Sequence, residues 1–232
     1  MNENNNIQYL GSQQDILIKW IKSMPLSQKK CIKNILSVNS GNGILDKKVI
    51  NLLPNIKNYY IMQSEYDNYQ NCIRNLFGNF KFKISYSDLF DYDLDTYITY
   101  DVIVFFDGFS DLSECSNFIN CCTNFINKES KIWIFTHEEN GYVNDVKKYF
   151  NVESTNDKML KDTIVNLKCK IFNTHIPTFI NVNSLNLLSL SQIIRKKCNN
   201  NDLLKFKEYT IKNYGENIEI PISVIILSNI KN

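Results

Sequence analysis

The polar, glycine-bearing stretch between residues 39 and 43 is the part of the sequence best suited to holding a ligand. It consists of Asn39, Ser40, Gly41, Asn42 and Gly43. It follows the apolar run Ile35 to Val38 and precedes Ile44 to Leu53, where apolar residues recur with helical spacing. Glycine tolerates positive φ and leaves room for a ligand close to the backbone. Strand, tight turn and helix form the opening unit of nucleotide-binding α/β domains; the alternative is a plain strand-to-helix corner.

Further polar residues follow the next two strand-like runs. In nucleotide-binding α/β folds, an acidic residue at the end of the second strand accepts hydrogen bonds from the ribose hydroxyls. Gln63 stands at that place, and Glu65 lies two residues further on. Ser87 and Asp88 follow the third strand and suit the adenine amino group, which needs an acceptor. Alternatively, Asp88 caps the turn that follows.

Carboxylates elsewhere suggest other chemistry. Asp107 closes the apolar run that begins at Tyr100 and could hold a substrate cation or accept its proton; alternatively it caps the next turn. The acids between Asp91 and Asp95 lack the glycine and terminal glutamate of a calcium loop. His137 to Glu139 could suggest hydrolysis, but no nucleophile elbow accompanies them, so we interpret them as a strand-end loop.

Composition limits the classes of function. The chain has 232 residues, 44% of them hydrophobic, which is enough for one large packed domain. A net charge of +2 gives no long-range field that would favour nucleic acid. Seven cysteines without a CxxC pair, and two distant histidines, predict no metal site. Without a long apolar run we expect no membrane span, and we expect a cytoplasmic monomer.

The elements that must position these residues alternate along the chain. After the first strand and helix, strands are predicted at Asn58 to Met62, Lys81 to Tyr86, Tyr100 to Asp107, Lys131 to Thr136, Lys168 to Thr174 and Glu219 to Ser228. Helices are predicted at Ile7 to Met24, Tyr66 to Phe77, Leu112 to Ile126, Tyr142 to Phe150, Thr155 to Asn166, Leu185 to Cys198 and Asp202 to Asn213. The Asn run at 199–201 is interpreted as a loop. This order predicts a doubly wound α/β sheet with an antiparallel C-terminal end.

Several segments in this order resemble one family. The segments are ILSVNSGNGILD (Ile35 to Asp46), YDVIVFFDGFSDLSE (Tyr100 to Glu114), KIWIFTHEENGYVNDVKKYF (Lys131 to Phe150) and the closing strand around Ser223. Together they resemble class I S-adenosylmethionine (SAM) methyltransferases of the histamine N-methyltransferase type, including Ser37 where most methyltransferases carry an acid. The resemblance implies a Rossmann-like, seven-stranded, mostly parallel sheet with an antiparallel last strand. It divides one domain into an N-terminal helical lid (1–30), a SAM-binding core (31–150) and a substrate-side part (151–232).

The resemblance also implies site residues. SAM would be bound by the 39–43 turn, by Gln63 or Glu65, by Ser87 and Asp88, and by Phe106. The acceptor amine would lie above Asp107, between the walls Tyr9, Phe109, Tyr142 and Val146, with polar help from Gln13 or Gln14 and Asn151.

These observations favour a SAM-dependent enzyme that methylates a small molecule, on an amine nitrogen, with Asp107 orienting the acceptor. One alternative is a degenerate methyltransferase fold that binds a partner without catalysis, since Asn39 and Gln63 replace expected cofactor residues. The other is a methyltransferase of protein or RNA. The near-neutral charge, and the lack of an Asn-Pro-Pro-Tyr type tetrapeptide after Val104, argue against nucleic-acid bases.

Overall fold

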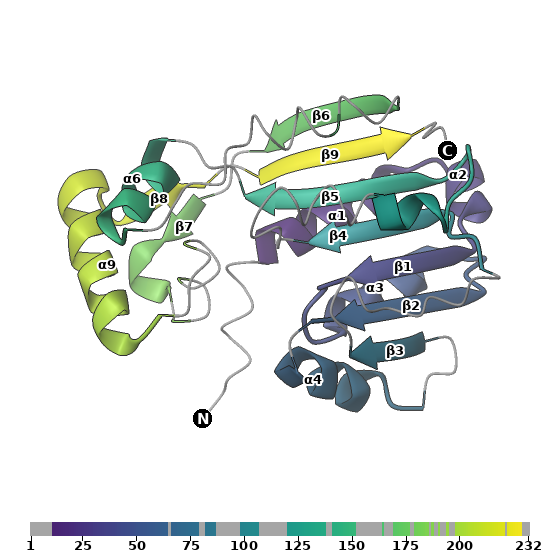
Figure 1. Cartoon of the computed structure of the whole chain (residues 1–232), viewed down its shortest axis with the longest axis horizontal. Coiled ribbons are helices and arrows are strands. Elements are labelled where there is room, and N and C mark those ends of the chain that lie inside the picture. The colour runs from purple at the N-terminus through teal and green to yellow at the C-terminus, as the bar shows by residue number, and fades with distance from the viewer. Residues whose placement is uncertain are drawn as a thin grey trace.

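The computed structural model (Figure 1) describes most of the chain. The described residues are 11–64, 66–78, 82–86, 98–106, 120–137, 141–151, 164, 169–176, 179–185, 187, 190, 194, 198–220 and 222–228. The helices are α1 (Gly11–Ser23), α2 (Leu26–Cys31), α3 (Ile44–Leu52), α4 (Tyr66–Leu76), α6 (Gly141–Tyr149) and α9 (Asn200–Tyr214), with a 3₁₀ turn η2 (Val182–Ser184). The strands are β1 (Asn34–Val38), β2 (Asn58–Gln63), β3 (Phe82–Tyr86), β4 (Val102–Phe106), β5 (Lys131–His137), β6 (Lys170–Ile176), β7 (Phe179–Asn181), β8 (Asn217–Glu219) and β9 (Ile222–Ser228).

The central sheet has seven strands in the order β3-β2-β1-β4-β5-β9-β6. β1 to β5 pair in parallel, whereas β9 runs antiparallel to both β5 and β6. The strand order reverses beside β1, so the turn after β1 lies at the switch point where ligands bind in open α/β sheets. The predicted fold class is confirmed: the sheet is seven-stranded and mostly parallel, and its last strand is antiparallel.

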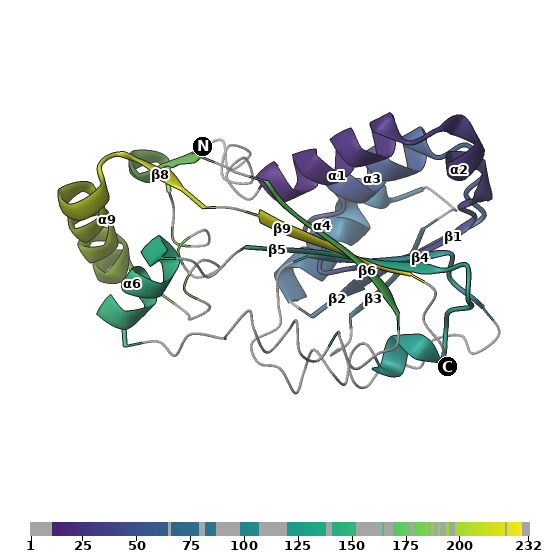
Figure 2. The same cartoon turned by 90° about the horizontal axis from the view of Figure 1, so that it is seen from above.

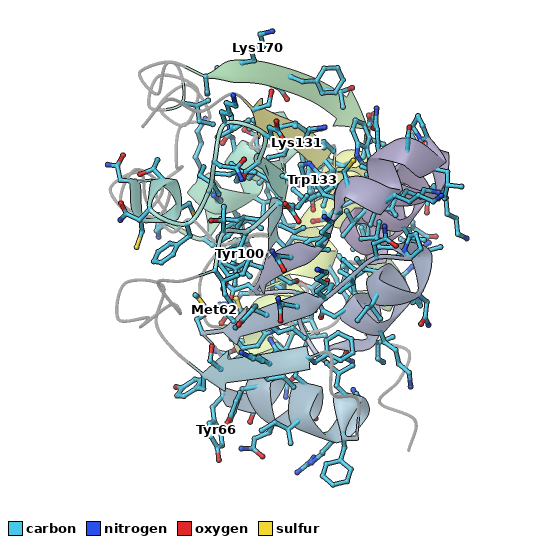
Figure 3. All side chains as sticks on the ribbon, turned by 90° about the vertical axis from the view of Figure 1, so that its right-hand side faces the viewer. Met62, Tyr66, Tyr100, Lys131, Trp133 and Lys170 are labelled. Carbon is cyan, nitrogen blue, oxygen red and sulfur yellow. The ribbon has the colours of Figure 1, made fainter. Side chains whose placement is uncertain are left out.

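Both faces of the sheet are covered, which explains why the central strands are apolar throughout. Ile35 of β1 and Tyr59 of β2 pack on the face that α1, α3 and α4 cover, while Leu36 packs on the opposite face. Figure 2 shows these helices together on one side of the sheet. Figure 3 shows the same layering with side chains; its labelled Trp133 belongs to the core beneath α1 and α3, and Met62 to the core of the other face.

A second core lies beyond the sheet and forms a small lobe, which we define by α6, β7, η2, β8 and α9. β7 and β8 pair as a two-stranded antiparallel sheet. The core contains Tyr142, Val143, Val146, Ile180, Val182, Leu185, Leu190, Ile194, Phe206, Ile218 and Ile220. The arrows of β1 to β5 point toward the side where this lobe lies (Figure 1). In this packing α6 contributes to the lobe core, while β6 and β9 belong to the central sheet; the predicted division into a lid, a core and a substrate-side part stays a prediction.

Other local differences have simple causes. The predicted strand from Glu219 to Ser228 is divided, because β8 pairs with β7 in the lobe and β9 enters the central sheet. The loop interpretation of the Asn run is wrong for Asn200 and Asn201, which begin α9; Asn199 caps this helix in a capping box with Asp202, a position that suits Asn. Helix α2 was not predicted because its six residues carry no apolar face. No helix in the described part of the chain is both long and apolar enough to span a membrane.

Candidate functional site: the turn after the first strand

The 39–43 turn has the backbone that its residue types predicted. Asn39, Gly41 and Gly43 adopt positive φ angles of 55°, 88° and 84°. Gly43 is also required by packing, because a Cβ there would lie 3.0 Å from Leu76 Cδ1 and 3.3 Å from the Cys72 backbone in α4. The turn thus lets β1 pass directly into α3 while α4 lies close against it.

Asn39 ties the turn to the end of the second strand. Its backbone N–H donates to the Met62 carbonyl at 2.9 Å, which extends the β1–β2 ladder by one residue. Its side-chain Oδ1 accepts hydrogen bonds from the Ser64 N–H at 3.2 Å and from the Ser64 hydroxyl at 3.0 Å. The carboxyl ends of β1 and β2 are therefore held together by the residue that replaces a glycine.

Two buried side chains hold the underside of the turn. Gln63 is only 1% exposed, and its Nε2 donates to the Gly41 carbonyl at 2.8 Å and lies 3.3 Å from Ser40 Oγ. The Cys72 thiol donates to the same carbonyl at 3.0 Å. The structure therefore gives Gln63 a role in bracing the turn. Its predicted contact with a ribose hydroxyl stays a prediction.

These bonds fix which way the turn presents its N–H groups. In a trans peptide the carbonyl and the following N–H point in opposite directions. Because the Gly41 carbonyl points into the protein, the Asn42 N–H points away from the buried side chains. The Asn42 carbonyl accepts from Asn75 Nδ2 of α4 at 2.9 Å, so the Gly43 N–H points away from α4. Two successive donors at a helix start form a concavity that suits an anionic group.

A buried carboxylate lies beneath the turn. Asp46, in the first turn of α3, is 0% exposed. Its Oδ2 accepts from the Ser40 hydroxyl at 2.6 Å, and its Oδ1 accepts from the Tyr59 hydroxyl at 2.9 Å. Burial raises the pKa of the Asp46 carboxyl above its ordinary value, and hydrogen bonds from Ser40, Ser37 and Tyr59 act in the opposite direction.

The neighbours of this carboxylate respond to the same burial. Burial raises the pKa of the Tyr59 hydroxyl, and the Asp46 charge adds to the effect. Burial raises the pKa of the Cys72 thiol to about 12, with a further contribution from Asp46. Cys72 is therefore a protonated hydrogen-bond donor at neutral pH and not a nucleophile.

Of the remaining predicted site residues that are described, Phe106, Tyr142 and Val146 pack in hydrophobic cores and Asn151 is exposed. Phe106, at the end of β4, is buried and stacks on Phe135 with ring centroids 5.5 Å apart. Tyr142 and Val146 lie in the core of the lobe, where the Tyr142 hydroxyl is 2.9 Å from Thr210 Oγ1. Asn151 follows α6 with φ of 52° and an exposed side chain. Their contacts with cofactor or substrate stay predictions.

Several predicted residues fall outside what the structure describes. Tyr9, Glu65, Ser87, Asp88, Asp107 and Phe109 lie outside the described residues, as do the side chains of Gln13 and Gln14. The segments that would carry Ser87 and Asp107 begin directly after the carboxyl ends of β3 and β4. β3 and β4 themselves end at Tyr86 and Phe106, at the same edge of the sheet as the turn.

Sequence reasoning missed Asp46, Tyr59 and Cys72 as parts of the site. In the sequence, Asp46 stands where a dinucleotide-binding turn would carry its third glycine. The available signal was an acid inside an apolar helix face: Leu45, Val49 and Ile50 around it are all buried. A charged residue on such a face needs a polar partner, and three hydroxyls provide it.

Comparisons with known proteins agree with this architecture. No protein-family model matches the sequence, and no curated protein matches it. Among solved structures, the YcgJ protein of Bacillus subtilis superposes with a TM-score of 0.63 at 10% identity, covering 94% of this chain and 98% of that one. The precorrin-6y C5,15-methyltransferase of Geobacter metallireducens GS-15 gives 0.53 at 10% identity, covering 92% and 86%.

A further similar structure is the plantazolicin methyltransferase BpumL in complex with SAH. It gives a TM-score of 0.53 at 12% identity and covers 98% of this chain and 86% of that one. At these identities the likeness is one of fold, and it agrees with the strand order, the antiparallel β9 and the turn after β1. The chain therefore has the Rossmann-like fold of the class I SAM-dependent methyltransferases.

Proposed function

We propose that the protein is a SAM-dependent methyltransferase that acts on a small molecule, on an amine nitrogen. The observation that carries the proposal is the orientation of the 39–43 turn. The buried Gln63 and Cys72 side chains hold the Gly41 carbonyl, and the exposed Asn75 side chain of α4 holds the Asn42 carbonyl. The two backbone N–H groups that follow these carbonyls therefore point away from α4, at the switch point of the sheet. The likeness to BpumL, a methyltransferase described in complex with SAH, supports the same cofactor class here.

The residues present fit such a cofactor. The outward N–H groups suit the carboxylate of its methionine part, and the glycines at 41 and 43 keep the backbone surface free of side chains. Glu65, Ser87 and Asp88 would contact the ribose and the adenine. When bound, SAM supplies an electrophilic methyl group on a sulfonium.

The protein's task in this reaction is alignment. The cofactor would supply the methyl group, with its sulfur as the leaving group, and the protein's residues would hold the amine nitrogen in line with that group and take up the proton that the nitrogen loses. Holding the amine in line with the methyl group supplies several kcal/mol by proximity. Asp107 would orient the amine and accept the proton. Aromatic side chains would favour the positive charges by about 0.5–2 kcal/mol each.

The cofactor half is tested by isothermal titration with SAM and SAH, using Gly41→Ala and Gly215→Ala as a matched pair. Both glycines have φ of 88°, so alanine is strained at both positions. A Cβ at Gly215 meets nothing within 4 Å, and Gly215 ends α9 in the lobe. We expect Gly41→Ala to weaken binding at least tenfold, a loss of about 1.4 kcal/mol, and Gly215→Ala to keep wild-type affinity.

Two outcomes would contradict the proposal. If the wild-type protein binds neither SAM nor SAH at millimolar concentration, the non-catalytic binding protein becomes the better interpretation. If both variants bind as the wild type does, the cofactor site lies elsewhere. The acceptor is tested separately by incubating the protein with labelled SAM and a panel of amines and following methylated products by mass spectrometry. If the label from SAM appears on protein or RNA and not on the amines, the small-molecule assignment is contradicted.

A further inference from the structure

The buried Asp46 carboxylate is connected to the outward face of the turn through a chain of hydrogen bonds. Ser40 donates to Asp46, and Gln63 Nε2 lies within 3.3 Å of Ser40 Oγ and within 2.8 Å of the Gly41 carbonyl. That carbonyl sets the direction of the Asn42 N–H. The position of an outward-facing donor thus depends on a carboxylate that is itself fully buried.

The donors in this chain all point toward Asp46. Gln63 donates to Ser40, Ser40 donates to one carboxylate oxygen, and Tyr59 donates to the other. An ionised carboxylate accepts the bonds from Ser40 and Tyr59, and its place in the first turn of α3 favours the negative charge further. A protonated carboxyl would carry a hydrogen toward a hydroxyl that already donates, so Ser40 or Tyr59 would have to turn away.

Burial opposes this ionisation. The groups around Asp46 are the Ser37 and Ser40 hydroxyls from β1 and its turn, Tyr59 from β2 and Cys72 from α4. Among them Tyr59 and Cys72 are titratable, and both have raised pKa values, so they are neutral near pH 7. No cation among the described residues contributes to the pKa of Asp46, which desolvation raises above 3.8. Whether Asp46 is protonated therefore depends on two opposing effects. The hydroxyl donors favour the ionised carboxylate, and desolvation favours the protonated form.

We propose that Asp46 is a positioning residue for the cofactor: its ionised carboxylate, acting through Ser40 and Gln63, holds the Gly41–Asn42 peptide with its N–H toward the ligand, so that cofactor affinity depends on the proton of Asp46. The proposal rests on the proposed function, since it names a control of the same binding site. It assigns to a buried acid of α3 the task of shaping the turn.

The proposal predicts opposite pH trends for affinity and stability. Because the pKa of Asp46 is raised in the folded protein, its contribution to stability is fully present below the unfolded value of 3.8 and is lost as pH rises through the folded value. Affinity follows the ionised form, and so it increases over that same rise in pH. A purely structural role for Asp46 would change stability with pH and leave the affinity of the folded protein unchanged.

The experiment measures the affinity for SAH and the thermal midpoint of the full-length protein between about pH 5 and pH 8, a range in which exposed carboxylates stay ionised. The variants are Asp46→Asn and, as a matched control, Asp202→Asn, which neutralises the acid in the α9 capping box. We expect wild-type affinity to fall toward low pH. We expect Asp46→Asn to bind about tenfold more weakly at pH 8, without pH dependence. Asp202→Asn should keep the wild-type profile.

Two further variants identify the titrating group and its path. Tyr59→Phe removes one donor that lowers the pKa of Asp46, and it should move the midpoint of the affinity profile to higher pH. Ser40→Ala breaks the connection to the turn and should flatten the profile, and it serves as the main test if Asp46→Asn does not fold. The inference about Asp46 is overturned, and the proposed function is not, if wild-type affinity does not change with pH or if the affinity of Asp46→Asn follows the same pH profile as the wild type. Failure of the wild type to bind SAH at any pH overturns the proposed function as well.

Discussion

The region beneath the 39–43 turn and the lobe differ in how they accommodate buried polar groups. Beneath the 39–43 turn, a carboxylate, two hydroxyls, an amide and a thiol are buried together around a strained backbone. In the lobe, the core is mostly apolar, and Tyr142 packs edge-on to Tyr214 at 4.9 Å; the charged Lys147 of α6 is also buried there, at 1% exposure. The pair formed by Tyr142 and Thr210 is a buried polar contact there.

We interpret this difference as one of role: the network beneath the turn shapes the candidate site, and the lobe core stabilises the fold. A buried polar network is costly unless every member is satisfied, so it specifies one arrangement of the groups it connects. An aromatic core gains free energy from burial and tolerates small shifts. We therefore expect substitutions beneath the turn to lower cofactor affinity, and substitutions in the lobe core to lower stability. The three predictions that follow test this separation.

The largest effect is expected for Phe206→Ala in the lobe. Phe206 is fully buried in the lobe core and lies 6.4 Å from the Phe150 ring. Removing a buried phenylalanine costs about 3–5 kcal/mol, which urea denaturation would measure. The matched control on the same helix is Leu204→Ala, because Leu204 is 60% exposed. SAH affinity should persist in the folded fraction, and its complete loss there would break the comparison.

An intermediate effect is expected for Gly43→Ala in the turn. The substitution forces a side chain into positive φ, at a cost of about 1–2 kcal/mol, and pushes it against Leu76. Unlike Phe206→Ala, it should lower SAH affinity as well as the midpoint of urea denaturation, because α4 and the turn must separate. The control is Gly78→Ala, since Gly78 also has positive φ but its Cβ meets nothing within 4 Å. Unchanged affinity in Gly43→Ala would show that the turn is not part of the site.

The smallest effect is expected for Tyr142→Phe. The change keeps the ring against Tyr214 and leaves Thr210 without its partner, at a cost of about 1 kcal/mol. Tyr149→Phe on the same helix is the control, because Tyr149 is 46% exposed and should tolerate the loss of its hydroxyl. Calorimetric melting would compare the two variants. If Tyr142→Phe instead leaves stability unchanged and abolishes turnover of an amine, Tyr142 contacts the substrate and the lobe core is part of the site.

Much of the sheet could be predicted from local pattern. The strands from Ile35, Tyr100 and Lys131 are continuous apolar runs, which suit a parallel sheet covered on both faces. Their predicted and observed bounds differ by one or two residues. The turn was predictable for the same local reason, since Asn and Gly are the residues that accept the positive φ found at 39, 41 and 43. The lobe was not, because β7 and β8 are three residues each and gain their stability from pairing with one another.

For individual polar residues, the position in the chain could be predicted from the sequence, but the contacts of the side chain could not. Gln63 was predicted at the end of the second strand, and it is there, but its side chain turns under Gly41. That direction depends on Ser40 and Cys72, which approach from other elements. Asn199 was read as part of a loop because Asn runs are common in this chain, whereas the N–H groups of α9 need its side chain as an acceptor.

The amino-acid sequence by itself determined the alternation of strands and helices, the depth of the apolar strands and the bend after β1, because each depends on the conformational preferences of a few neighbouring residues. Only the tertiary structure decided that Asp46, Tyr59, Gln63 and Cys72 share one buried network beneath that bend. Their contacts join β1, β2, α3 and α4 across up to 31 positions of sequence separation. Whether a carboxylate is solvated or enclosed depends on which distant side chains close over it, and this depends on the packed core as a whole.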